Sequence, residues 1–500
     1  YYSAERRERQ AAKKNFSQHP SNSFRQFLAV SDKKRCFLTQ RTSPIPFLAA
    51  MPERRYNKEK DPDGEESDMN ERTGIWARFT ESRAFLPCAG FAAGIFAGGV
   101  SALYRLSLQF ASDTLGHALT FIRKSAGWTA LWFLILIGLA WLTSLLVRRQ
   151  PLIGGSGIPQ LECELHGKIK SPWLSVLLCK FAGGFLCLLG GLSLGREGPS
   201  IQMGAMAGKG LSRFLRRDGE DERVLISCGA SAGLAAAFHA PAAGVLFCLE
   251  ELHHTFTPQL LLPLMTAVLS ADLISVQVFG VGPVFQFAPQ TDFTPVLYLL
   301  VVPLGLLLGV LGAFYNSATM AVVRFLQDKS GLPVFVRLLI PFLTAGVLAL
   351  CAPSLLGSGH NLVEQAAAGD YLLEILLLLL VCKFLFSLLS FGSGAPGGIF
   401  FPLLVLGALI GCSYGVCAVQ LFGMETELIA AFLLLGMAGN FAAIVRAPFT
   451  GAILLFEMTG SVHTLLPLLA VSLIACATAD ALRSAPIYDS LAARLCRAAD

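Results

Sequence analysis

The chain has 500 residues, of which 54% are hydrophobic and 15% are charged, and its formal net charge is +5. An average soluble domain carries roughly 25% charged residues, so this chain has too few polar residues to cover the surface of a soluble protein. The composition therefore excludes an ordinary cytoplasmic enzyme, a nucleic-acid-binding protein and a disordered protein. Because about 20 apolar residues cross a bilayer and several runs are that long, we predict a polytopic membrane protein.

The first 84 residues differ from the rest of the chain. Residues 1–85 contain 17 Lys+Arg and 12 Asp+Glu, so the net charge belongs to this segment. Basic segments beside membrane spans favour the cytosolic side, and we expect residues 1–84 to form a cytosolic tail. Residues 1–50 show no signal-peptide pattern. The first methionine is Met51, which leaves two hypotheses: translation starts there, or residues 1–50 are a disordered tail.

Residues 85–495 are predicted to form the membrane domain. Closely spaced glycines are typical of packed membrane helices, and the alternating strands of a transmembrane β-barrel are missing. We therefore expect an all-α bundle of about ten to twelve spans. The apolar runs lie near residues 85–107, 128–147, 172–194, 224–249, 259–280, 295–323, 336–356, 371–391, 399–421, 427–456 and 463–481.

An internal repeat organises this domain. A proline, a glycine and a glutamate recur at a spacing of 207 residues: Pro241 and Pro448, Gly244 and Gly451, and Glu250 and Glu457. Gly-Ser-Gly stands earlier in each half, at 155–157 and 357–359. We predict two copies of one plan, about residues 85–280 and 293–480. Repeats of this kind are typical of transporters, whose binding site lies at the repeat interface near mid-membrane.

Three glycine-proline clusters interrupt the apolar runs: Gly155-Ser156-Gly157-Ile158-Pro159, Gly195-Arg196-Glu197-Gly198-Pro199 and Gly397-Gly398-Ile399-Phe400-Phe401-Pro402. Non-helical backbone cannot face lipid, so each cluster must be buried in protein or line a watery cavity. Proline suits the first turn of a new helix, and Ser156 is a suitable N-cap residue. Helix starts carry unpaired N–H groups and partial positive charge. Three of them meeting at mid-membrane predict an anion site, whereas kinks or tight packing are the alternative interpretation.

Acidic residues inside the membrane domain are candidates for function, because a carboxylate is costly there. Glu197 stands at a predicted helix start. Its charged form would occupy an anion position and its protonated form would swing away, as a gate does. Arg196 either compensates this charge or packs locally. Glu250 and Glu251 end an apolar run and Tyr488 follows the last one; taken alone, they fit an exposed acidic pair and an interfacial tyrosine anchor.

The cysteines and histidines predict no metal centre, and no cofactor is expected. No cysteine pair has C-x-x-C spacing, and His253-His254 has no acidic or cysteine ligand at a fitting spacing. We interpret the histidine pair as part of an interfacial loop. Free cysteines that behave as small hydrophobic residues are expected at Cys163, Cys179, Cys187, Cys228, Cys248, Cys351, Cys382, Cys412, Cys417 and Cys476.

The three clusters, in this order and spacing, resemble the signature of the CLC chloride channels and chloride–proton exchangers. The resemblance covers about residues 85–495. It implies two inverted halves of tilted, partly re-entrant helices, and a homodimer in which each subunit has its own anion pathway. It also implies a multi-pass protein of the plasma or inner membrane with both termini in the cytosol. Only 12 residues follow Tyr488, so we expect the short prokaryotic type without a C-terminal regulatory domain.

The resemblance further implies roles for individual residues. The chloride ligands that it implies are the hydroxyls of Ser156 and Tyr488 and the backbone N–H groups of Ile399 and Phe400. Glu197 matches the external gating glutamate, which also passes protons, and Glu251 matches the internal proton-transfer glutamate. Because pure channels commonly lack an acid at the inner position, Glu251 favours chloride–proton antiport. A passive voltage- or pH-gated chloride channel is the alternative.

A third hypothesis comes from the enzyme class. Gly154-Gly155-Ser156-Gly157 fits the Gly-x-Ser-Gly of rhomboid-like intramembrane serine proteases. A protease of this kind needs a histidine base on another membrane helix, for which His239 is the candidate. The repeat and the other two clusters have no role in such a protease, so we expect no enzyme.

Overall fold

The structure is a computed structural model that describes residues 82, 84–285, 287, 295–369 and 371–499. The chain divides into two units, Tyr1–Thr73 and Gly74–Asp500, and all described residues belong to the second. The predicted cytosolic tail lies almost entirely outside the described residues. Both hypotheses about residues 1–50 fall in that part of the chain.

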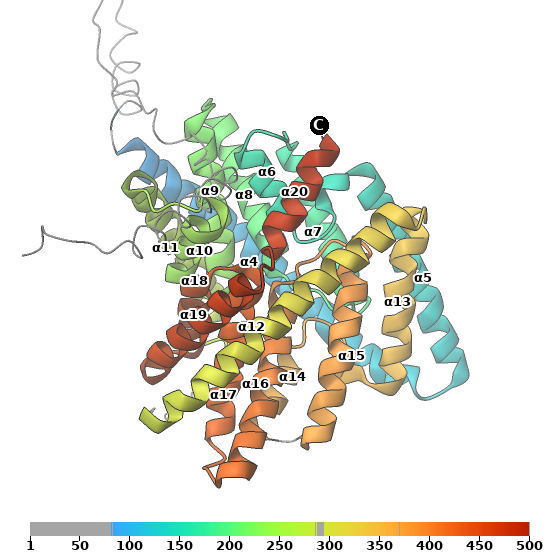
Figure 1. Cartoon of the computed structure of the whole chain (residues 1–500). Helices are drawn as coiled ribbons and strands as arrows, with labels where there is room; N and C mark the ends of the chain where they lie inside the picture. Colours follow the sequence, from blue (N-terminus) through green and yellow to red (C-terminus); the bar gives the residue numbers. More distant parts are fainter. Residues whose placement is uncertain (1–81, 83, 286, 288–294, 370, 500) are drawn as a thin grey trace, which may run out of the picture. The chain divides into compact units, whose positions relative to one another are not determined.

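The described residues form helices, which confirms the predicted all-α membrane fold (Figure 1). Within them, β-type pairing is limited to two isolated bridges. In chain order the helices are α4 (Phe85–Ile122), α5 (Ala126–Arg149), α6 (Ile158–Leu165), α7 (Trp173–Leu189), α8 (Glu197–Phe214), α9 (Glu220–Phe238), α10 (Pro241–Phe247), α11 (Pro258–Phe279), α12 (Pro295–Val323), α13 (Val334–Cys351), α14 (His360–Ala367), α15 (Leu373–Gly392), α16 (Phe400–Phe422), α17 (Leu428–Val445), α18 (Pro448–Thr459), α19 (Leu465–Ala481) and α20 (Ile487–Ala499).

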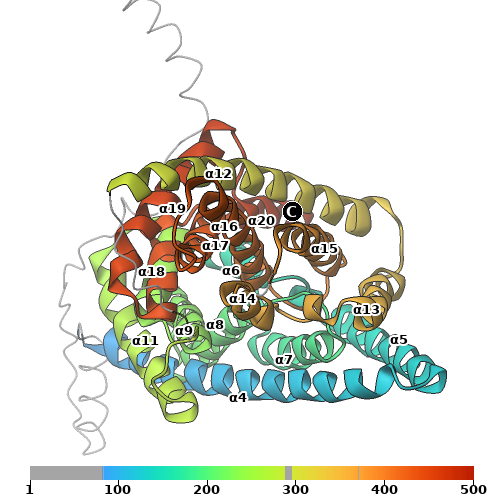
Figure 2. The same ribbon diagram turned by 90° about the horizontal axis from the view of Figure 1, so that it is seen from below.

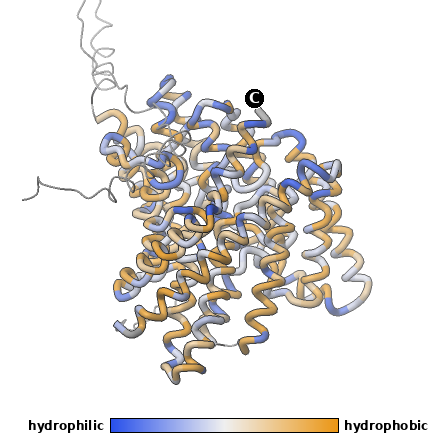
Figure 3. The backbone as a smooth tube through the Cα atoms, in the orientation of Figure 1, coloured by the Kyte–Doolittle hydropathy of each residue, from blue (hydrophilic) through white to orange (hydrophobic). Residues whose placement is uncertain are grey.

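Nine helices in the described part of the chain are long and apolar enough to cross a membrane. Two further apolar helices, α7 and α18, are shorter than these nine. The sequence predicted about ten to twelve spans. Large apolar side chains face outward from α4, α12 and α15, with Phe110 65%, Leu299 71% and Leu378 63% exposed. Hydrophobic residues run along the outer helices (Figure 3). A contiguous apolar surface of this kind requires a bilayer or a partner to cover it.

Matching helix pairs form the interior of the two halves. α8 packs on α9, and α16 packs on α17. A Cβ on Gly204 would lie 2.2 Å from the Gly229 carbonyl oxygen, and a Cβ on Gly407 would lie 2.4 Å from the Gly436 carbonyl oxygen. Only glycine allows either contact. α16 and α17 have 78% and 89% of their most apolar stretch buried, and Figure 2 shows them enclosed by neighbouring helices.

Each half caps a helix of the other half with a glutamate. The Glu457 carboxylate accepts hydrogen bonds from the N–H groups of Ala242 and Ala243 at the start of α10, at 2.9 and 2.8 Å. The Glu250 carboxylate accepts hydrogen bonds from two N–H groups at the start of α18, at 3.3 and 2.8 Å. An anionic side chain there satisfies donors that the helix itself leaves unpaired. The glutamate that recurs in the sequence, as Glu250 and Glu457, therefore caps a helix of the opposite half in each case.

We expect Glu457→Ala to lower the free energy of unfolding by about 2 kcal/mol, because hydrogen bonds to charged groups contribute roughly 1.5–3 kcal/mol. Thermal unfolding in detergent, followed by circular dichroism, measures the loss. Glu374→Ala is the matched control, because Glu374 is an exposed glutamate in the first turn of α15. Equal losses in the two variants would contradict the capping role.

Candidate functional site

The three glycine-proline clusters meet in the interior of the structure. The Gly155 N–H donates to the Ala395 carbonyl at 3.2 Å, and the Gly397 N–H donates to the Gly155 carbonyl at 3.0 Å. Gly195 and Gly398 exchange two backbone hydrogen bonds, at 2.7 and 2.9 Å. Non-helical backbone is thus satisfied by other non-helical backbone, as burial in an apolar bundle requires.

A helix begins at each cluster. α6 begins at Ile158, α8 at Glu197 and α16 at Phe400, and a proline occupies the first turn of each, as predicted. The first N–H groups of a helix have no acceptor within it, and they carry partial positive charge. The backbone N–H groups of Ile399 and Phe400 belong to the start of α16. Their predicted role as chloride ligands stays a prediction.

Ser156 lies at the start of α6 but is not its N-cap. The N-cap is Gly157, whose φ of 96° is left-handed, a conformation that glycine adopts without steric cost. The Ser156 hydroxyl accepts a hydrogen bond from the Ile158 N–H at 3.3 Å, and the residue is 1% exposed. The expectation of a Ser156 cap is therefore wrong by one position, because the tight turn needs glycine where the cap stands.

Two buried lysines hold the Gly-Ser-Gly turns. Lys180 on α7 donates to the carbonyls of Ile153 and Gly155, at 2.8 and 2.7 Å. Lys383 on α15 makes the matching bonds in the second half, to Leu355 and to the first glycine of its turn, both at 2.9 Å. Sequence reasoning missed these residues. The available signal was a lone lysine inside an apolar run after each Gly-Ser-Gly.

Tyr488 lies at the start of α20, with its side chain fully buried. Its hydroxyl has no hydrogen-bond partner among the described residues. The hydroxyl is therefore available to donate a hydrogen bond to an acceptor from outside the protein. α20 packs against α6, the helix that follows Ser156. The structure thereby brings the two predicted hydroxyl ligands onto neighbouring elements, which their separation in the sequence did not reveal.

A disulfide joins these same two helices and corrects the expectation of free cysteines. Cys163 on α6 is bonded to Cys496 on α20, with their Cα atoms 6.2 Å apart and a sequence separation of 333. Sequence spacing gives no sign of a bond over such a distance, because only the packing of α20 on α6 brings the cysteines together. The other cysteines of the predicted set are free.

Glu197 is buried at the start of α8, where it is 1% exposed. One oxygen of its carboxylate, Oε2, is shielded from solvent and has no hydrogen-bond partner among the described residues. The Nε atom of Arg196 lies 3.8 Å from one carboxylate oxygen. Of the two roles expected for Arg196, compensation of the Glu197 charge is therefore the one that the structure supports. A cavity of about 370 Å³, also lined by Arg105 and His360, opens onto Glu197.

Glu251 lies in a single π-helical turn, Cys248–Leu252. It is 3% exposed, and one of its carboxylate oxygens has no hydrogen-bond partner among the described residues. Tyr488 interacts electrostatically with both Glu251 and Glu197. The adjacent Glu250 points instead to the start of α18. Consecutive side chains of a helix with 3.6 residues per turn point about 100° apart, so the two adjacent acids face different surroundings.

The histidines form contacts that the sequence did not predict. His239 Nδ1 lies 2.7 Å from Asp272 Oδ1, so the proposed protease base pairs with an aspartate. His254 Nε2 lies 4.0 Å from Asp489 Oδ1, and Glu162 joins the same cluster. Sequence spacing offered His254 no fitting acidic ligand, and the acids beside it come from distant segments.

Comparisons with known proteins agree with this geometry. The family described as "Voltage gated chloride channel" matches residues 139–480. The H(+)/Cl(-) exchange transporter ClcA of Vibrio cholerae serotype O1 (strain M66-2) is 38% identical over 410 residues, which cover 80% of this chain and 87% of that protein. The ClcA of Salmonella paratyphi A (strain ATCC 9150 / SARB42) is 37% identical over 375 residues, covering 72% and 78%.

A solved structure extends the likeness to the whole fold. The X-ray structure of a slow cyanobacterial Cl⁻/H⁺ antiporter superposes with a TM-score of 0.79 at 30% identity, covering 83% of this chain and 99% of the antiporter. The chain belongs to the voltage-gated chloride channel (CLC) family.

Proposed function

We propose that this protein exchanges chloride for protons across a membrane. The observation that carries the proposal is the meeting of three helix starts in the interior, with a buried glutamate at one of them. Glu197 stands at one of these starts, Glu251 lies in the π-turn, and Tyr488 interacts with both. The exchangers named among its relatives support the same activity.

In this proposal chloride is held mainly by dipoles. Its ligands are the hydroxyls of Ser156 and Tyr488 and the N–H groups of Ile399 and Phe400. The lysine ammonium groups bind carbonyl oxygens of the Gly-Ser-Gly turns, so they brace the backbone instead of binding the anion directly. Sites made of partial charges bind an anion without holding it too tightly to leave.

The two glutamates have different roles in proton transfer. A charged Glu197 competes with chloride for the N–H groups at the helix starts, and a protonated Glu197 loses that attraction and moves aside. Glu251 takes up or releases the proton on the opposite side of Tyr488. Chloride and protons are the transported substrates, and no cofactor takes part.

We further infer a homodimer in a plasma or inner membrane, with both termini in the cytosol and one pathway in each subunit. Membrane location is supported by the nine apolar spans of the described residues. We also infer that the protein is a transporter and not a protease. The exchange transporters among its relatives, which match over most of the chain, support this inference.

We expect Glu251→Gln to abolish proton movement and to spare chloride movement, because glutamine cannot carry a proton. The protein is reconstituted in liposomes under a chloride gradient, and chloride efflux and internal pH are recorded together. Glu250→Gln is the matched control, because the adjacent Glu250 carboxylate is bonded to the start of α18. Intact proton pumping in Glu251→Gln would remove that residue from the mechanism. A passive channel, the alternative function, would show chloride flux with no coupled proton movement in the unchanged protein.

We expect Glu197→Gln to remove both the coupling to protons and the pH dependence of chloride transport. A glutamine at the helix start resembles the protonated gate at every pH, since it has no charge to lose. Chloride flux measured from about pH 4.5 to about pH 7.5 tests this. That interval begins near the ordinary pKa of a glutamate and includes that of a histidine. A pH profile identical to that of the unchanged protein would contradict the gating role.

We expect Tyr488→Phe and Ser156→Ala each to weaken chloride binding by about tenfold, because a hydrogen bond to a charged group contributes roughly 1.5–3 kcal/mol. Isothermal titration calorimetry of the detergent-purified protein measures the affinity. Tyr414→Phe and Ser413→Ala are the controls, because their hydroxyls bond to backbone carbonyls of α12 and α16. Unchanged affinity in both site variants would exclude these hydroxyls as ligands.

A further inference from the structure

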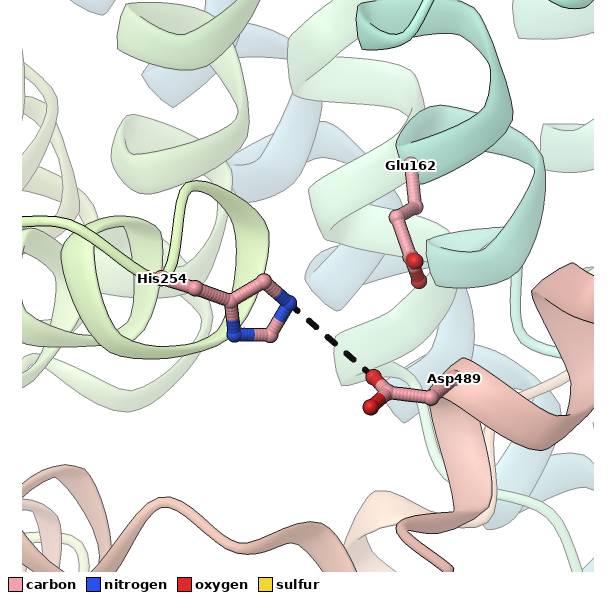
Figure 4. A group of neighbouring side chains, drawn as sticks. All are labelled: Glu162, His254 and Asp489. Carbon is pink, nitrogen blue, oxygen red and sulfur yellow. Dashed lines mark ion pairs between the residues drawn. The ribbon is translucent and has the colours of Figure 1, made fainter. Parts of the chain in front are cut away.

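Three potential metal ligands converge from three distant segments. Glu162 lies on α6, His254 lies in the loop after the π-turn, and Asp489 lies on α20. One ligand atom from each lies within 4.8 Å of the others, and Figure 4 shows the imidazole and the two carboxylates turned toward one common point. The two acids are half-buried and the histidine is exposed, so a dissolved ion has access to the cluster.

The hydrogen bond of His254 orients its ring for metal binding. Its Nδ1 atom lies 3.1 Å from the Glu250 carbonyl oxygen. A carbonyl only accepts hydrogen bonds, so Nδ1 carries the proton of the neutral ring. The lone pair then sits on Nε2, the atom that faces Asp489. Histidine ligands of metal ions are typically held by such a bond from the other ring nitrogen to a backbone carbonyl.

The remaining groups of the cluster are acceptors without donors. Asp489 Oδ1 is shielded from solvent and accepts no hydrogen bond from the described residues. Asp489 also interacts electrostatically with the like-charged Glu162. A charged imidazole explains this arrangement poorly, because the 4.0 Å between Nε2 and Oδ1 exceeds a hydrogen bond. A cation between the three atoms satisfies all of them.

We propose that Glu162, His254 and Asp489 bind a Zn²⁺ ion. One imidazole and two carboxylates form a three-ligand zinc site whose fourth position holds water, and an imidazole ligand disfavours Mg²⁺ and Ca²⁺. Ligands at about 2.1 Å from zinc lie roughly 3.4 Å apart, so the side chains close in by about 1 Å on binding. The exposed His254 is free to make that movement, while the Cys163–Cys496 bond holds α6 to α20.

The site lies beside Glu251, because His254 is hydrogen-bonded to the carbonyl of the adjacent Glu250, and Glu251 interacts electrostatically with Asp489 and Glu162. Here the inference rests on the proposed function of Glu251 as the proton-transfer residue. A divalent ion on these two carboxylates repels protons and occupies the polar route to the buried acid. Bound Zn²⁺ therefore inhibits proton-coupled transport from the membrane face that carries α20.

Binding is tested without any transport measurement. Isothermal titration calorimetry with ZnCl₂ on the purified full chain is expected to show one site per subunit. His254→Ala and Asp489→Asn are expected to weaken it by more than about tenfold, because even outer-shell changes weaken metal sites by 10–100-fold. His117→Ala, at an exposed histidine on α4, is expected to change nothing. Absent binding, or equal binding in His254→Ala, overturns the site.

The transport consequence is tested in liposomes with ZnCl₂ added to one face at a time. We expect inhibition of proton-coupled chloride flux from the α20 face alone, and resistance in His254→Ala. Zinc binding without inhibition would overturn the placement of the site on the proton route. A failure of the proposed function is distinguishable, because it appears as intact proton pumping in Glu251→Gln with no zinc present.

Discussion

The structure depends on keeping unpaired backbone satisfied where three helices break inside an apolar bundle. A broken helix in such surroundings leaves N–H and C=O groups that water cannot reach. The loops solve this by bonding to one another, through Gly155 and Gly397 and through Gly195 and Gly398. Lys180 and Lys383 donate hydrogen bonds to carbonyl oxygens of the Gly-Ser-Gly turns. The helix-start N–H groups have no acceptor within their own helices, and they are the donors that the proposed chloride site uses.

Duplication supplies this arrangement twice. The two halves repeat the glycine contact between neighbouring helices, the lysine under the Gly-Ser-Gly turn and the glutamate that caps a helix of the opposite half. Each half is therefore incomplete without the other. The repeat departs from symmetry at Glu251, next to the Glu250 cap: this second acid is buried in the π-turn and interacts electrostatically with Tyr488.

Most of the fold class and the location of the site could be predicted from local sequence. Apolar run length, the recurring residues and the three clusters each depend on neighbours along the chain. The errors and omissions concern contacts between distant segments. Cys163 was expected to be free and is bonded to Cys496, and sequence spacing offered His254 no fitting acidic ligand, whereas the structure places it beside Asp489. Ser156 was placed one position wrong as a cap, because spacing does not reveal which residue of a tight turn is left-handed.

The sequence by itself determined an all-α membrane protein, two copies of one plan, three helix starts and a glutamate at one of them. These features follow from periodicity, glycine and proline, whose effects on the backbone are local. Only the tertiary structure decided which buried groups meet. α20 packs on α6, and this packing places Tyr488 on the helix beside the one that follows Ser156, joins two cysteines and gathers Glu162 with Asp489. The physical reason is that packing acts across space, between residues that no sequence spacing relates.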